Sequence, residues 1–142
     1  MPGRVVPMNA FTMKNWEEKI VSGTEGSGPR VAYAHATFAY EGVIEGESIC
    51  DLLLYYAGEG YESGQTTSPS FERFEGKVEG REGTFITRHE YTFDAKGIAS
   101  TFTVVPGSGT GELAGLTGRM EVVIAAGGAH SYRFDWQLPG AD

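Results

Sequence analysis

The chain is 142 residues long, which suits one domain with a single hydrophobic core. Its 40% hydrophobic and 12% aromatic content is typical of a globular protein and excludes a disordered one. The formal net charge of −8 argues against nucleic acids and anionic membranes as partners, because both attract basic surfaces. We therefore expect one domain over residues 1–142, with residues 1–9 as a loose lead-in.

Features that would direct the chain to another compartment are few. The single cysteine, Cys50, excludes an internal disulfide bond and suits a reducing compartment. Residues 1–16 lack the unbroken apolar run of a secretory signal, and no apolar run approaches transmembrane length. We therefore expect a cytoplasmic protein.

Alternating polar and apolar residues, separated by glycine-rich turns, predict strands along most of the chain. No convincing helical period and no internal repeat is visible. Trp16 falls one step out of the alternation that begins at Phe11, so we expect a β-bulge in the first strand. Residues 22–29 have the composition of a loop. The expected strands cover about residues 10–20, 30–40, 43–56, 70–78, 84–93, 98–105, 119–125 and 130–138.

The pairing of the second and third strands depends on the turn at residues 41–42. A two-residue turn there places His35 opposite Ser48. In the same register Tyr33 lies opposite Cys50, so all four side chains share one face. We expect this face to be the inner one, while a slip of one residue would invert the assignment.

Residues 57–69 form the longest polar stretch of the chain. A loop of this length in a compact domain is often a lid or a binding loop. An ordinary mobile connection explains the composition equally well, so both interpretations stay open.

The fourth and fifth strands carry the most distinctive polar residues. A turn within residues 80–83 places Phe74 opposite His89, and in the same register Glu72 lies opposite Tyr91. The alternate face of both strands is mostly charged. Because side chains of a barrel strand alternate between inside and outside, we expect Glu72, Phe74, His89 and Tyr91 to point inward.

The last three strands extend the inner face. We expect it to carry Ser100, Phe102 and Val104, and then His130, Tyr132, Phe134, Trp136 and Leu138. Met120, Val122 and Ile124 join this face only if the turn at Gly127 and Gly128 has three residues, and the sequence leaves that register open.

Residues 104–118 form a long loop with five glycines between two strands. Leu113 and Leu116 stand between the glycines, so we expect the loop to fold back and anchor itself on apolar surface. A phosphate-binding loop would require a helix after the last glycine, whereas Gly118 is followed by a strand pattern. The loop is therefore interpreted as structural.

The same stretch, VVPGSGTGELAGLTG, resembles the signature of a family of small bacterial proteins known as DUF3224. The resemblance continues upstream through residues 72–76, residues 80–85 and His89. That family is similar to the allene oxide cyclase and dirigent-like barrels. The resemblance implies a closed antiparallel β-barrel of about eight strands with a small-molecule cavity, but it implies no particular reaction.

Glu72 and His89 are the predicted catalytic residues. Burial in an apolar cavity favours a protonated carboxyl group, and a neighbouring imidazole can orient it or share its proton. A buried structural hydrogen bond is the competing interpretation. The predicted substrate-binding residues are Tyr33, His35, Phe74, Tyr91, Phe102, Tyr132 and Trp136.

Other chemistry is less well supported by the sequence. Cys50 lacks the orienting group and oxyanion hole that a nucleophile requires, so we expect a small core residue. No ligand-spacing motif indicates a metal, and we expect no metal and no cofactor.

Three functions remain open. The first is a barrel that binds a small apolar or amphipathic molecule and acts as a cofactor-independent cyclase or isomerase. The second is a non-catalytic carrier or sensor, and the third is a filled barrel that acts through its surface or a homodimer interface.

Overall fold

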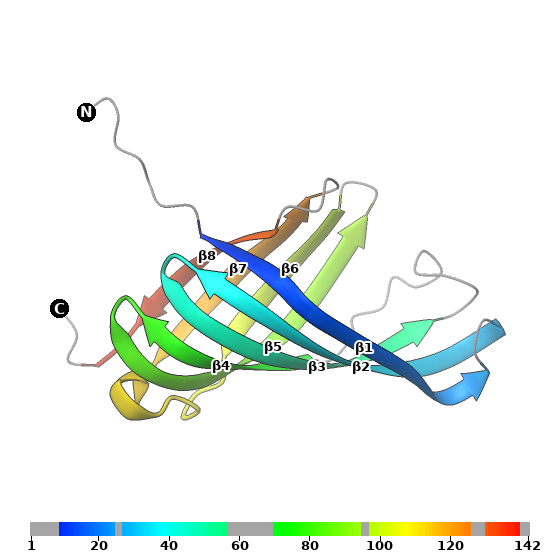
Figure 1. Ribbon diagram of the computed structural model, residues 1–142, viewed down its shortest axis with the longest axis horizontal. Helices are drawn as coiled ribbons and strands as arrows, with labels where there is room; N and C mark the ends of the chain where they lie inside the picture. The colour runs from blue at the N-terminus through cyan, green and yellow to red at the C-terminus, as the bar shows by residue number, and fades with distance from the viewer. Residues whose placement is uncertain (1–8, 25–26, 57–69, 95–96, 126–129, 140–142) are drawn as a thin grey trace.

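The computed structural model describes residues 9–24, 27–56, 70–94, 97–125 and 130–139. Eight antiparallel strands, each hydrogen-bonded to the next in sequence, form one sheet that closes into a ring (Figure 1). The predicted all-β fold is confirmed. The strands are β1 (Ala10–Thr24), β2 (Ser27–Glu41), β3 (Ile44–Tyr56), β4 (Ser70–Val78), β5 (Arg81–Asp94), β6 (Gly97–Val104), β7 (Thr117–Ala125) and β8 (His130–Gln137). Among the described residues, no helix is long and apolar enough to cross a membrane.

The ring closes over a very short contact between β1 and β8. Ala10 pairs with Ser131, and the backbone N–H of Tyr132 donates to the carbonyl of Asn9 over 3.2 Å. Beyond Ala10, the described residues of β1 pair only with β2. Figure 1 shows β1 diverging from β8 and running alongside β2, which is paired with β3 on its other edge as far as Arg30.

The first hairpin differs from the prediction at its tip. Residues 22–24 and 27–29 lie in strands, because β1 continues to Thr24 and β2 begins at Ser27 opposite it; residues 25 and 26 lie outside the described residues. The predicted bulge in β1 is confirmed between Met13 and Asn15, and further register shifts follow near Ser22. These irregularities let both strands continue through a segment rich in glycine and serine.

The fourth and fifth strands pair through a turn that lies earlier in the chain than predicted. Val78 lies opposite Arg81, so Glu79 and Gly80 form a two-residue turn and β5 begins at Arg81. Phe74 therefore faces Phe85 instead of His89. The difference is an even number of residues, so the predicted inner face of both strands is correct.

Aromatic side chains fill the half of the closed sheet's interior that lies toward the glycine-rich loop. Tyr40 and Phe74 have ring centroids 4.9 Å apart, and Phe74 stacks on Phe85 at 4.6 Å. Phe134 continues the stack at 6.0 Å from Phe85. Each fully buried ring of this size contributes roughly 2 kcal/mol of hydrophobic stabilisation. This half of the interior is a packed core.

The glycine-rich loop covers the end of this core, as predicted. It contains the short 3-10 helix η2 (Gly111–Leu113), and both Leu113 and Leu116 are fully buried. The N–H of Thr110 donates to the carbonyl of Thr84 over 2.9 Å, which ties the loop to β5. The backbones approach so closely that a Cβ on Gly83 would lie 2.0 Å from the carbonyl oxygen of Thr110. A side chain at position 83 is therefore incompatible with this docking.

Candidate functional site

The most distinctive polar group of the interior is the carboxylate of Glu72, which is only 1% exposed. Its Oε2 accepts hydrogen bonds from the hydroxyls of Tyr40, over 2.8 Å, and Ser48. Its Oε1 lies 3.0 Å from Nε2 of His89, itself 3% exposed. The predicted neighbourhood of Glu72 and His89 is thus confirmed, and each carboxylate oxygen has its own partners.

His89 is held from two further sides. Its ring stacks on Phe102, with centroids 3.4 Å apart and planes within 2°. Its Nδ1 lies 3.9 Å from Sγ of Cys50. Since the sheet brings Cys50, Glu72 and Thr87 opposite one another on β3, β4 and β5, the cluster follows directly from strand register. We call Glu72 and His89 the inner dyad.

Burial changes the protonation of the neighbours of the inner dyad. Loss of solvent, reinforced by the charge of Glu72, raises the pKa of Tyr40 well above its usual value. Burial likewise raises the pKa of the Cys50 thiol, and the carboxylates of Glu72 and Asp51 add to the effect. At neutral pH Tyr40 is therefore a hydrogen-bond donor and Cys50 a protonated thiol.

The surroundings of the inner dyad differ on its two sides. Toward the glycine-rich loop lie the stacked aromatic rings of the core. On the opposite side the buried inner residues include several small ones: Ala32, Ala34, Ser70 and Ser100. Thr87 is fully buried, and its hydroxyl has no hydrogen-bond partner among the described residues. An unpaired buried hydroxyl costs about 1–3 kcal/mol, which a polar group of a bound molecule would offset.

Four of the predicted binding residues lie on the inner face. Phe74, Phe102 and Tyr132 are buried there, and Trp136 is half-buried. All three buried residues belong to the packed core, and Phe102 also contacts His89 directly. The backbone of Tyr91 pairs with Ser100, but its side chain lies outside the described residues.

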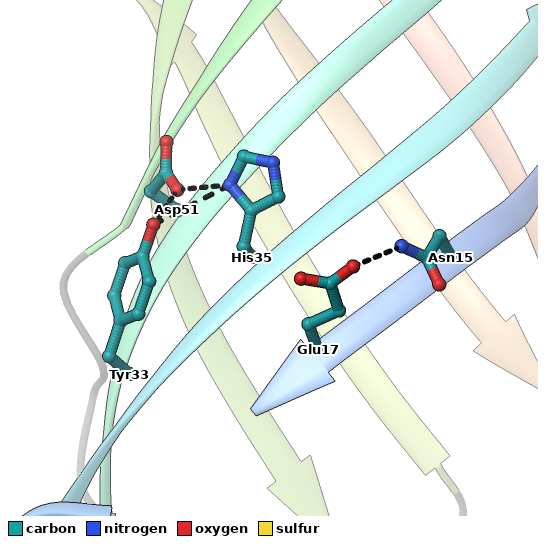
Figure 2. Close-up of polar contacts among 5 residues, drawn as sticks. All are labelled: Asn15, Glu17, Tyr33, His35 and Asp51. Atoms are coloured by element: carbon teal, nitrogen blue, oxygen red, sulfur yellow. Dashed lines mark hydrogen bonds and ion pairs between the residues drawn. The ribbon is translucent and has the colours of Figure 1, made fainter. Parts of the chain in front are cut away.

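The predicted inward orientation of Tyr33 and His35 is wrong. Tyr33 lies opposite Leu53 and His35 opposite Asp51, three residues away from the predicted register. An odd shift moves one strand to the other face, so the alanines of β2 are inside and Tyr33 and His35 are outside. On that outer face both side chains turn toward Asp51 (Figure 2).

The outer cluster of Tyr33, His35 and Asp51 is compact but partly exposed. The Tyr33 hydroxyl donates to Oδ1 of Asp51 over 2.5 Å, and Nδ1 of His35 lies 2.8 Å from the same oxygen. Partial burial alone would raise the pKa of Asp51, but these two contacts outweigh it and lower the pKa. The hydrogen bond to Asp51 also raises the pKa of Tyr33. Glu17 of β1 lies beside this cluster and is bound by Asn15 (Figure 2).

The sequence interpretation missed the contribution of Tyr40 and Ser48 to the inner dyad. Tyr40 lies on the face of β2 opposite to His35, and the structure shows this face to be the inner one. The signal was present in the small, apolar residues at positions 32, 34 and 36, which suit a crowded interior better than a solvated surface.

A depression of about 470 Å³ lies on the outer side of β3 and β4. Charged side chains form much of its lining, including Lys14, Glu47, Arg73 and Glu75. Lys14 pairs with Glu47, and Arg73 lies 3.3 Å from Glu75. This surface hollow differs in character from the aromatic-lined pocket that the sequence predicted for the interior.

Comparison with known protein families matches residues 8–136 to the model of DUF3224, described as a protein of unknown function. The chain belongs to the DUF3224 family. This DUF3224 protein is also similar to a solved structure, a DUF3224-family protein of unknown function from Shewanella oneidensis MR-1. The TM-score is 0.63 with 23% sequence identity, over 92% of this chain and 98% of that chain. At this identity the likeness shows the fold alone. A search among curated proteins gave no match.

Proposed function

We propose that this DUF3224 protein binds a small, largely apolar molecule inside the ring and transfers a proton on it with Glu72 and His89. The observation that carries the proposal is the 3.0 Å approach of Glu72 Oε1 to His89 Nε2, deep in the interior. Two titratable groups in contact, shielded from water, are the usual arrangement for general acid–base catalysis. The reaction class is cyclisation or isomerisation without a redox step.

The surroundings of the inner dyad support a positioned base. Tyr40 and Ser48 hold one oxygen of Glu72, and Phe102 fixes the plane of the His89 ring. Side chains held in this way are already in position when the reaction begins. Little further ordering is needed, which lowers the free-energy barrier of the reaction. One member of the dyad removes a proton from carbon or oxygen of the bound molecule, and the other returns one elsewhere.

The bound molecule would lie on the side of the dyad away from the aromatic core. Small side chains such as Ala34 and Ser70 line that side, and Thr87 offers a hydroxyl without a partner among the described residues. A carbonyl oxygen of the ligand would accept a hydrogen bond from the Thr87 hydroxyl. A hydroxyl group of the ligand would either accept or donate one there. Apolar contact with Phe102 would hold its hydrocarbon part.

Hydrogen exchange at carbon tests this reaction class without knowledge of the natural substrate. A panel of small apolar ketones is incubated with the protein in D₂O, and deuterium uptake next to the carbonyl is followed by NMR. The wild type should accelerate uptake for at least one ketone. Glu72→Gln and His89→Ala should remove the acceleration, and added imidazole should partly restore it in His89→Ala.

The control is Glu75→Gln, which makes the same chemical change on the outer face of the same strand and should exchange like the wild type. Ketone binding is measured in parallel by perturbation of NMR signals. Binding without accelerated exchange in the wild type would refute catalysis and favour a carrier. Neither binding nor exchange across the panel would refute the interior site as well.

A further inference from the structure

The inner dyad has a third buried neighbour that can bind a metal. Cys50, Glu72 and His89 each offer one ligand atom, and these three atoms lie within 4.8 Å of one another. The residues are 1%, 1% and 3% exposed. They come from three adjacent strands, so the sheet itself fixes their separation.

We propose that Cys50, Glu72 and His89 form a binding site for one divalent transition-metal ion, with Zn²⁺ as the best match. Thiolate, imidazole and carboxylate are the three ligand types that zinc uses in proteins. The thiolate disfavours Mg²⁺ and Ca²⁺, which prefer oxygen ligands. Three protein ligands leave a fourth position for water or a small ligand, as in catalytic rather than structural zinc sites.

The distances are close to those of a loaded site. A nitrogen and a sulfur bound to one tetrahedral Zn²⁺ lie about 3.6 Å apart, from bonds of roughly 2.1 and 2.3 Å. Nδ1 of His89 and Sγ of Cys50 are 3.9 Å apart. All three ligand atoms lie within 4.8 Å of one another, so the separations would close by about 1 Å or less on loading.

The charges also suit a divalent ion. A thiolate from Cys50 and the carboxylate of Glu72 together carry two negative charges, and a neutral His89 adds none. One divalent cation would make the buried cluster electrically neutral, which low-polarity surroundings favour. Hydrogen bonds from Tyr40 and Ser48 to Glu72 supply the outer contacts that orient a metal-binding carboxylate.

Metal binding at this site does not depend on the proposed reaction, but it would affect that reaction. A metal ion bound to Nδ1 of His89 would draw the Glu72 carboxylate away from Nε2, the nitrogen that the inner dyad uses to share a proton. Loading would also release the thiol proton of Cys50 and any proton held between Glu72 and His89. Metal binding and proton transfer are therefore alternative uses of the same residues.

Cobalt titration gives a direct readout. Co²⁺ replaces Zn²⁺ in such sites, and a thiolate bound to it gives a near-ultraviolet charge-transfer band. Because the chain has one cysteine, the band can come only from Cys50. Co²⁺ is added to the folded protein and, separately, during refolding, so that slow entry cannot hide the site. The wild type should show the band with one equivalent of Co²⁺, and Zn²⁺ should remove it.

Three variants complete the test. Cys50→Ser should abolish the band, and Glu72→Gln should weaken Co²⁺ binding at least tenfold. His35→Ala removes an exposed histidine of the outer cluster and should bind like the wild type. Absence of the band in the wild type under both loading conditions would overturn the proposal. Unchanged Co²⁺ affinity in Glu72→Gln would also overturn it, because the site would then lack one of its three ligands.

Discussion

Leu116→Ala tests whether the glycine-rich loop is anchored by its leucines. Leu116 is fully buried in the same cluster as Phe85 and Met120. Truncating a fully buried leucine costs 2–5 kcal/mol, from lost transfer free energy and the cavity left behind. We expect about 3 kcal/mol, near the middle of this range, because the tethered loop can relax over the cavity only in part. The melting temperature should fall by about 10 °C.

Urea unfolding followed by tryptophan fluorescence measures the loss. The midpoint should fall while the slope stays constant, because the same surface is exposed on unfolding. Thr117→Ala is the matched control, since the neighbouring side chain is exposed and its removal should change the free energy of unfolding by about 0.5 kcal/mol or less. If Leu116→Ala unfolds within 0.5 kcal/mol of the wild type, roughly the range of a surface change, the loop is not anchored as described.

Three further predictions concern other parts of the ring. Gly83→Ala should destabilise the protein more than Gly80→Ala: the new Cβ at position 83 meets the Thr110 carbonyl at 2.0 Å, whereas at position 80 it meets nothing within 4 Å and only the positive φ of 84° adds about 1–2 kcal/mol of strain. Equal losses in urea unfolding would contradict the docking. The folded-state pKa of Asp51 is lowered, so its stabilisation is present above its ordinary pKa of 3.8 and is lost as pH falls through the folded value. Asp51→Asn should therefore lose less stability than the wild type as the pH falls below about 4, and an identical pH profile would show that the outer cluster is uncoupled from folding. The buried thiol of Cys50, with its raised pKa, should react with a thiol reagent at neutral pH only on unfolding; rapid labelling of the folded protein would refute its burial.

Strand alternation alone identified the two residues of the inner dyad. The turn between β4 and β5 was predicted within residues 80–83, while the structure turns at Glu79 and Gly80. The pairing shifted by four residues, yet Glu72 and His89 stayed on the inner face because four is even. Which face of a strand a residue occupies follows from alternation within that strand alone. In β4 the alternate residues are charged, so the sequence was enough to identify the inner face.

The turn between β2 and β3 could not be predicted in the same way. Tyr40 pairs with Gly46, so the chain needs a wider connection than two residues. The Tyr132 hydroxyl accepts from the N–H of Ile44 over 2.9 Å and donates to the carbonyl of Glu41 over 2.7 Å. Because a side chain from β8 satisfies this wide turn, its shape depends on a contact about ninety residues away that local turn preferences do not contain.

We expect Glu72 and His89 to share a proton inside the closed sheet, and NMR of the His89 side chain tests this most directly. With ¹⁵N-labelled protein, the imidazole nitrogen signals of His89 are assigned by elimination, using the His35→Ala variant and a variant that replaces His130. We expect a proton on Nε2 of His89 that exchanges slowly with water. Its NMR signal should shift strongly in Glu72→Gln and stay unchanged in Glu75→Gln. An Nε2 proton that exchanges freely, or one that Glu72→Gln leaves unchanged, would contradict the claim.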